Sequence, residues 1–227
     1  MPTTSVENYL KAIYSAQQGD AGRVKTKRIA QALEVSRPSV SGMLKSLAAE
    51  GLVDYRPYKG ARLTDEGRHM ALKVIRNHRL IEVFLVKTLG YSWDEVHDEA
   101  ERLEHAVSDK LVSRIDAFLN HPRFDPHGDP IPTAEGQVET REMLNLTDVQ
   151  EGKEVRLERV MDQTPEVLRY MDRIGLRPGS ELRVDEVLDF DGQMFLTVEG
   201  EDVVVSQRLA GMMLVTRGEV GDEQGER

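Results

Sequence analysis

The chain contains no cysteine among its 227 residues, which excludes disulfide bonds and thiolate metal sites. No stretch approaches the ~18 uninterrupted apolar residues that a membrane-spanning helix needs. The N-terminal sequence MPTTSVENYL lacks the basic and apolar regions of a signal peptide. Apolar residues make up 39% of the chain and charged residues 31%, which is typical of a globular protein. We therefore expect a cytoplasmic protein with two domains, or one domain with appendages.

The net charge is −10, but the charge is distributed unevenly along the chain. Residues 1–63 contain ten Lys/Arg and five Asp/Glu, a local net charge of +5. The remaining residues contain twenty Lys/Arg and thirty-five Asp/Glu, a net charge of −15. This charge asymmetry can orient the basic N-terminal part of the chain toward phosphates.

The first 63 residues predict helix, short helix, turn, helix and β-hairpin. The apolar spacing indicates an amphipathic helix over residues 4–18 and a short helix over 25–33. A further helix follows Ser36, a predicted N-cap, with Pro38 in its first turn. Residues 52–56 and 61–63 predict two short strands around a turn. This order is typical of a winged helix-turn-helix.

In that motif the second helix of the pair enters the major groove with its N-terminal residues toward the bases. Arginine can bond bidentately to guanine, and serine serves either base type. Basic residues on the wing would contact phosphates, which fix register without encoding sequence. The residues expected to contact DNA are Lys27, Arg37, Pro38, Ser39, Ser41, Lys45, Lys59 and Arg62. The alternative is a three-helix core with a hairpin that binds another protein.

Thr64 is expected to cap a helix over 65–89, and a second helix is expected from Trp93 to about Val107. These two helices contain a possible metal site. His78 and Glu82 are four residues apart and share a helix face. Glu101 and Glu104 are three residues apart, a spacing at which like charges repel in a bare helix, whereas a divalent cation between them converts repulsion into coordination. The candidate ligands are His78, Glu82, His97, Glu101, Glu104 and His105. The alternative is a solvated acidic helix face.

The rest of the chain predicts a small second domain, with strands over 155–160, 181–188, 194–198 and 203–205. A third helix is expected over 108–119, with residues 121–140 forming a loop rich in proline and glycine. The expected domains are 1–63 for DNA binding, 64–140 for metal binding and dimerisation, a linker over 141–150, and a β-barrel-like domain over 151–217. A short helix, capped by Thr164, is expected over 164–173. The polar tail 218–227 is expected to be disordered.

The sequence resembles the diphtheria toxin repressor family of metal-dependent transcription regulators over nearly the whole chain. The matching segments are residues 9–14, 35–41, 63–67, 78–80, 96–100 and 104–105. Residues 125–132 resemble the family's Cys-Pro-His-Gly loop, with Asp125 where cysteine is common. The resemblance implies a mainly α chain with a winged helix-turn-helix, a helical metal-binding and dimerisation domain, and an SH3-like C-terminal β-barrel.

The resemblance also implies how the candidate ligands divide between two sites. His78, Glu82 and His97 match the family's ancillary site. Glu101, Glu104 and His105 match its primary site, to which Asn8 on the first helix would contribute. In some relatives the C-terminal domain lends a ligand to the ancillary site, and Asp162, Gln163 and Glu166 lie in the matching neighbourhood.

The identity of the metal is indicated by two departures from the iron-sensing pattern. Iron-sensing members tend to have cysteine at the position of Glu101 and methionine at that of Asn8. Oxygen donors at both positions resemble the manganese-responsive branch, because Mn²⁺ prefers harder ligands. Some manganese regulators have a glutamate at the position of Lys11 that helps to bind a second ion. A protonated lysine cannot ligate.

These observations predict a homodimeric repressor dependent on Mn²⁺ (or Fe²⁺) that binds an inverted-repeat operator of metal-homeostasis genes. Val107, Leu111, Ile115 and Leu119 would form either the dimer seam or core within the domain. The alternatives are an iron-responsive member of the same family and a regulator with an organic ligand. An enzyme with a di-metal site would need Glu-x-x-His from two helices, and neither helix supplies it.

Overall fold

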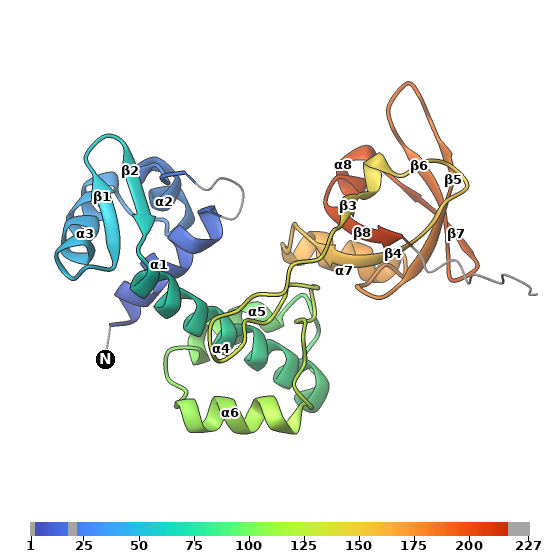
Figure 1. Cartoon of the computed structure of the whole chain (residues 1–227). Coiled ribbons are helices and arrows are strands. Elements are labelled where there is room, and N and C mark those ends of the chain that lie inside the picture. The colour runs from blue at the N-terminus through green and yellow to red at the C-terminus, as the bar shows by residue number, and fades with distance from the viewer. Residues whose placement is uncertain (1–2, 18–21, 218–227) are drawn as a thin grey trace, which may run out of the picture. The chain divides into compact units, whose positions relative to one another are not determined.

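The computed structural model describes residues 3–17 and 22–217, so the predicted disordered tail 218–227 lies outside the described residues. The chain divides into two compact units. Figure 1 shows the chain coloured by residue number from blue at the N-terminus to red. The first unit comprises Met1–Phe84, Asp98–Arg123 and Ile131–Glu139. The second comprises Leu85–His97, Phe124–Pro130 and Thr140–Arg227. No helix in the described ranges is long and apolar enough to cross a membrane.

The first unit begins with the predicted helix-turn-helix and hairpin. Its elements are α1 (Thr4–Gln17), α2 (Thr26–Ala32), α3 (Arg37–Ala49), β1 (Val53–Arg56) and β2 (Gly60–Leu63). The Ser36 hydroxyl accepts a hydrogen bond from the Ser39 amide at 3.2 Å, which confirms the predicted N-cap of α3. A bridge between Val24 and Ala61 ties the hairpin to the segment before α2.

One apolar core joins these elements to the start of the long helix α4 (Asp65–Leu89). Leu10 and Ile13 of α1 and Leu44 of α3 are fully buried in it. The core also contains Leu72 of α4. The Thr64 hydroxyl accepts a hydrogen bond from the Gly67 amide at 3.1 Å, which confirms the predicted cap of α4. The first turns of α4 are therefore packed rigidly against the winged helix.

Two shorter helices follow: α5 (Val96–Leu103), which belongs to the first unit from Asp98 onward, and α6 (Asp109–Phe118). The predicted helix from Trp93 to Val107 is thus too long at both ends. Ser108 caps α6 through a bond from the Leu111 amide at 3.3 Å and has extended backbone angles. An N-cap residue cannot continue a preceding helix, so α5 ends before it. Glu104 and His105 consequently lie in the turn after α5.

The second unit contains a six-stranded antiparallel sheet in the order β3-β8-β4-β5-β6-β7. Its elements are β3 (Leu144–Asn145), the 3₁₀ helix η1 (Leu146–Asp148), β4 (Glu154–Val160), α7 (Pro165–Arg173), β5 (Glu181–Val187), β6 (Met194–Val198), β7 (Glu201–Val205), α8 (Gln207–Ala210) and β8 (Met213–Arg217). Strands β3 and β7 are the edges of this sheet, so the barrel-like domain that we expected contains a six-stranded sheet that is not closed.

Two further expectations for the second unit need correction. The predicted linker 141–150 contains β3 and η1, because Leu144 and Asn145 pair with β8, a strand that the periodicity did not indicate. The Thr164 side chain makes no cap bond to α7. Instead, the Asp162 carboxylate accepts a hydrogen bond from the Thr164 amide at 3.1 Å.

The loop 125–130 is ordered within the second unit. The buried Asp125 carboxylate accepts hydrogen bonds from the amides of His127 at 2.8 Å and Asp129 at 2.9 Å. The His127 ring stacks on Trp93 with a centroid distance of 6.0 Å, and its Nε2 lies 2.7 Å from the Trp93 carbonyl oxygen. Gly128 has a φ of +87°. A loop so densely bonded behaves as part of the core.

Candidate metal centre and DNA-reading helix

Helix α1 presents two charged side chains, Glu7 and Lys11, one turn apart and therefore on one face. The Lys11 ammonium donates to both carboxylate oxygens of Glu104, at 2.8 and 3.0 Å, and to Glu101 at 3.4 Å. Its Nζ also lies 3.3 Å from Nδ1 of His78. The first helix of the winged domain is thus bonded directly to candidate ligands on α4, on α5 and in the turn after it.

Glu104 is the central residue of this cluster, and its side chain is only 1% exposed. One carboxylate oxygen lies 2.5 Å from Nδ1 of His78, and the other lies 3.2 Å from Nε2 of His105. The structure therefore brings together the predicted primary set of Glu101, Glu104 and His105. It adds His78, which the resemblance had assigned to the other site.

Besides Lys11, α1 reaches this cluster through Glu7 and not through Asn8, the residue that the resemblance implied. Nδ1 of His105 lies 2.5 Å from a carboxylate oxygen of Glu7. Among the described residues, no hydrogen bond or ion pair joins Asn8 to the predicted ligands. Sequence reasoning missed Glu7 because it followed the family position. The available signal was that Glu7 and Lys11 lie one turn apart and therefore share a helix face.

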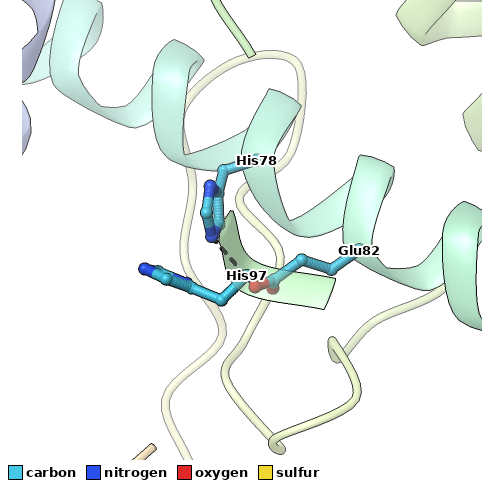
Figure 2. A group of neighbouring side chains, drawn as sticks. All are labelled: His78, Glu82 and His97. Carbon is cyan, nitrogen blue, oxygen red and sulfur yellow. Dashed lines mark hydrogen bonds and ion pairs between the residues drawn. The ribbon is translucent and has the colours of Figure 1, made fainter. Parts of the chain in front are cut away.

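The predicted ancillary set also comes together (Figure 2). Nε2 of His78 lies 2.9 Å from a carboxylate oxygen of Glu82, one turn along α4. One ligand atom from each of His78, Glu82 and His97 lies within 4.8 Å of the others. His97 is the second residue of α5, which places its ring beside the α4 pair. Imidazole with carboxylate is a donor set that suits first-row divalent cations, so these residues fit such an ion.

Two carboxylates control the charge state of His78 in the metal-free protein. Burial by itself lowers the pKa of the ring, but the hydrogen bonds to Glu104 and Glu82 outweigh it and raise the pKa to about 9. Burial raises the pKa of Glu104, but the bond to His78 and the charge of Lys11 outweigh it, so this pKa is lowered. Binding a cation through the His78 nitrogens at neutral pH therefore requires release of a proton.

Because the folded pKa of His78 exceeds the ~6.5 of an unfolded histidine, we predict a pH-dependent stability of the metal-free chain. The stabilisation is fully present below pH ~6.5 and is lost as pH rises through about 9. The loss is about 3 kcal/mol in order of magnitude. Urea unfolding in chelator at several pH values measures it, with His78→Gln as the control. An equally steep decline in that variant would contradict the assignment.

The surface predicted to read DNA is formed by the N-terminal turns of α3 and by the wing. The Arg37, Pro38, Ser39 and Lys45 side chains are exposed, and Ser41 is half-buried. The hydroxyls of Ser36 and Ser39 lie 2.8 Å apart, so Ser39 is already engaged in the cap. Lys27, Lys59 and Arg62 are exposed as expected.

An acidic residue holds the basic side chains of the wing. The Asp54 carboxylate pairs with Arg23, with Arg62 at 3.1 Å and with Arg56 at 3.9 Å. The hydrogen bond from Arg23 holds the pKa of Asp54 below its usual range. At the tip of the hairpin Tyr58 is fully exposed and has a φ of +64°.

The three candidates from the C-terminal region lie in the second unit. The Gln163 amide donates to Asp129 at 2.7 Å, and Asp162 accepts from the Thr164 amide. Glu166 is exposed in the first turn of α7. An additional metal ligand from these residues remains a prediction.

Three family models match successive parts of the chain. Residues 1–61 match the N-terminal DNA-binding domain of iron-dependent repressors, and 64–133 match their metal-binding and dimerisation domain. Residues 144–217 match the FeoA domain.

Whole-chain comparisons agree with these models. The iron-dependent repressor IdeR of Mycobacterium leprae is 30% identical, with 94% of this chain and 97% of that protein covered. The diphtheria toxin repressor of Corynebacterium efficiens is also 30% identical, with 94% and 95% covered. A solved manganese-dependent transcriptional repressor in complex with manganese is 43% identical, with 93% and 99% covered and a TM-score of 0.84. The chain belongs to the diphtheria toxin repressor family of iron- and manganese-dependent repressors.

Proposed function

We propose that this protein is a transcriptional repressor of metal-homeostasis genes that acts in the cytoplasm as a homodimer on a palindromic operator. Its co-repressor is Mn²⁺ or, as the alternative, Fe²⁺. We also propose the division into residues 1–63, 64–140 and 151–217 for DNA binding, metal binding and the C-terminal domain. Family membership supports the general function, and the donor set supports the choice of a divalent cation.

The observation that carries this proposal is the direct bonding of α1 to the candidate ligands. Glu7 contacts His105, and Lys11 contacts Glu104, in each case across about ninety residues of sequence. Leu10 and Ile13, on the other face of α1, are fully buried in the core that contains Leu44 of α3. A change in how the ligands hold α1 is therefore transmitted to the DNA-reading helix by contiguous packing.

A bound divalent cation supplies positive charge that the ligand carboxylates share. Glu101, Glu104, His105 and His78 would hold it on one side, with Glu7 or Asn8 on the α1 side. Glu82 and His97 would complete the second set around His78. In the absence of a cation, α1 is joined to these residues through two side chains, Glu7 and Lys11. Coupling of about 1–3 kcal/mol corresponds to a change in DNA affinity of roughly 5–150-fold.

The choice between manganese and iron rests on the ligand types. The primary set contains oxygen and nitrogen donors only, and no sulfur ligand is available because the chain lacks cysteine and the position before Tyr9 is asparagine. The carboxylate and amide oxygens of this set are hard donors, which suit Mn²⁺. The 43% identical solved relative is named as manganese-dependent, whereas the 30% identical relatives are named for iron or for the diphtheria toxin repressor.

The test is operator binding by the full chain in chelator and in Mn²⁺, Fe²⁺ and Zn²⁺. An operator can be obtained by selecting from random duplexes in the presence of Mn²⁺. We expect tight binding with Mn²⁺ and weak binding in chelator. Equal affinity under both conditions would reject metal dependence. Failure of the selection to yield any sequence would reject specific DNA binding.

Arg37 offers a test of the reading surface, because it is exposed at the first position of α3. We expect Arg37→Ala to weaken binding to the selected operator by about 1–3 kcal/mol, since bidentate base contacts are worth that much. Binding to random duplex should change less. Fluorescence anisotropy with both duplexes measures the difference. Lys110→Ala, an exposed basic residue of α6, is the matched control. Equal losses on both duplexes would identify Arg37 as a phosphate contact only.

A homodimer would use the outer face of α6. Leu111 and Phe118 are 47% and 65% exposed there, two turns apart, and the Phe118 ring packs edge-on against Phe84 at 6.2 Å. Ile115 belongs to the core, and Val107 and Leu119 pack against it, so these three do not form an exposed seam. We propose Leu111 and Phe118 as the seam, with sedimentation equilibrium of Phe118→Glu as the check. A dimer that persists in this variant would exclude them.

A further inference from the structure

We propose that Asp54 is a positioning residue of the wing, and that it holds Arg62 and Arg56 ready to contact DNA phosphates. This assignment rests on the proposed function, because it concerns part of the DNA-binding surface. Asp54 lies directly opposite Arg62 in the pairing of β1 with β2, and Arg56 lies two residues further along β1. Paired residues, and residues two apart in one strand, share a face of the hairpin. The carboxylate and the two guanidinium groups therefore lie on one face.

Arg23 fixes the Asp54 carboxylate from the side of the domain. It donates one hydrogen bond to the Asp54 side chain and another to the Asp54 backbone carbonyl. The Arg23 side chain is only 16% exposed, and the next residue, Val24, is joined to Ala61 of β2 by two backbone hydrogen bonds of 2.7 and 3.0 Å. The carboxylate is thus bonded to a largely buried arginine on a segment that is tied to the wing, which leaves it little freedom to turn.

The two wing arginines face this carboxylate through the same atom. Nε of Arg62 donates to one carboxylate oxygen of Asp54 at 3.1 Å, and Nε of Arg56 lies 3.9 Å from the other. A guanidinium group carries further donors on its terminal nitrogens, in the planar fork that suits phosphate oxygens. The Arg62 and Arg56 side chains are 55% and 61% exposed, so an outside acceptor can approach them. Each arginine can therefore remain beside Asp54 while it binds a phosphate.

The sign of the effect on DNA affinity distinguishes positioning from charge. A carboxylate on a DNA-binding surface repels phosphates, so its removal should tighten binding if charge alone matters. Side chains that are already ordered lose less conformational entropy on binding. If Asp54 orders the two arginines, its removal should weaken binding although it also removes a negative charge.

The experiment compares Asp54→Ala with the unsubstituted full chain, in Mn²⁺, on the selected operator and on random duplex. We expect both affinities to fall roughly three- to tenfold, the cost of ordering the two side chains. Both duplexes should respond, because phosphate contacts encode no sequence. Glu50→Gln is the matched control: it removes one negative charge at the end of α3, where Glu50 bonds to Ser46 and not to an arginine. This control should not weaken binding.

A chain with Arg56→Gln and Arg62→Gln separates positioning from a purely structural role. These two substitutions should make the slope of log affinity against log salt concentration shallower by about 2, since each phosphate contact contributes about 0.9. Adding Asp54→Ala to this chain should not weaken binding further, because no wing arginine is left to position. A further loss in this background would show that Asp54 acts on the structure of the domain and would overturn the inference.

Unchanged or tighter binding by Asp54→Ala would also overturn it, and so would an unchanged salt dependence in the chain with both glutamines. If Asp54→Ala fails to fold, Asp54→Asn takes its place with the same expected results. Asparagine keeps an oxygen that accepts from Arg23 but lacks the charge that attracts Arg56 and Arg62. Failure of the unsubstituted chain to bind any duplex would instead overturn the proposed function.

Discussion

Glu101→Gln should reduce operator affinity in the presence of Mn²⁺ by about 5–150-fold, to the level seen in chelator. The substitution removes a ligand charge and keeps the shape of the side chain. Glu101 is 54% exposed on α5, and its contact to Lys11 is long at 3.4 Å, so the fold should be unaffected. Anisotropy titrations with the selected operator, with and without Mn²⁺, measure the loss.

Glu99→Gln is the matched control for that experiment. Glu99 lies on the same helix and pairs with Arg102 at 3.1 Å, an exposed contact away from the centre. Its substitution should leave the metal response unchanged, because exposed ion pairs contribute ~0–1 kcal/mol. A full Mn²⁺ response in Glu101→Gln would remove Glu101 from the ligand set. A loss in both variants would point to a general effect of the charge of α5.

Gly128→Ala should lower the free energy of unfolding of the second unit by about 3 kcal/mol or more. Two features combine at this position. The backbone φ of +87° is strained for any residue with a side chain, and an added Cβ would lie 1.8 Å from the Glu158 carbonyl oxygen. Backbone atoms cannot move aside cheaply, so the loop 125–130 must separate from β4. Urea unfolding followed by Trp93 fluorescence measures the change, because Trp93 stacks on His127 of this loop.

Gly152→Ala separates backbone strain from the steric clash. Gly152 also has a positive φ, of +75°, in the second unit, but an added Cβ would meet no atom within 4 Å. Its substitution should therefore cost only about 1–2 kcal/mol, the backbone cost of a left-handed conformation for a residue with a side chain. Similar losses in the two variants would mean that the loop yields without resistance and that its contact with β4 is not structurally important.

Local signals were sufficient for the elements whose causes are local. Ser36 and Pro38 predicted the start of α3, and Thr64 predicted the start of α4, because an N-cap depends on residues three positions apart. Extrapolating the α5 pattern past Leu103 failed, because the chain forms a turn from Glu104, ahead of the Ser108 cap of α6. Strand β8 was missed because its pairing partner, β4, lies more than fifty residues earlier.

The sequence by itself determined the residue types of the metal centre, the basic character of the N-terminal part of the chain, and the two helices that contain His78 and Glu101. Spacing along a helix fixes which side chains share a face, and that geometry requires no partner. Only the tertiary structure decided that Glu7 rather than Asn8 meets His105, that Lys11 bonds Glu104, and that one His78 ring joins both ligand sets. Those contacts cross 26 to 98 residues of chain, apart from the four-residue step to Glu82, and depend on how α1 packs beside α4.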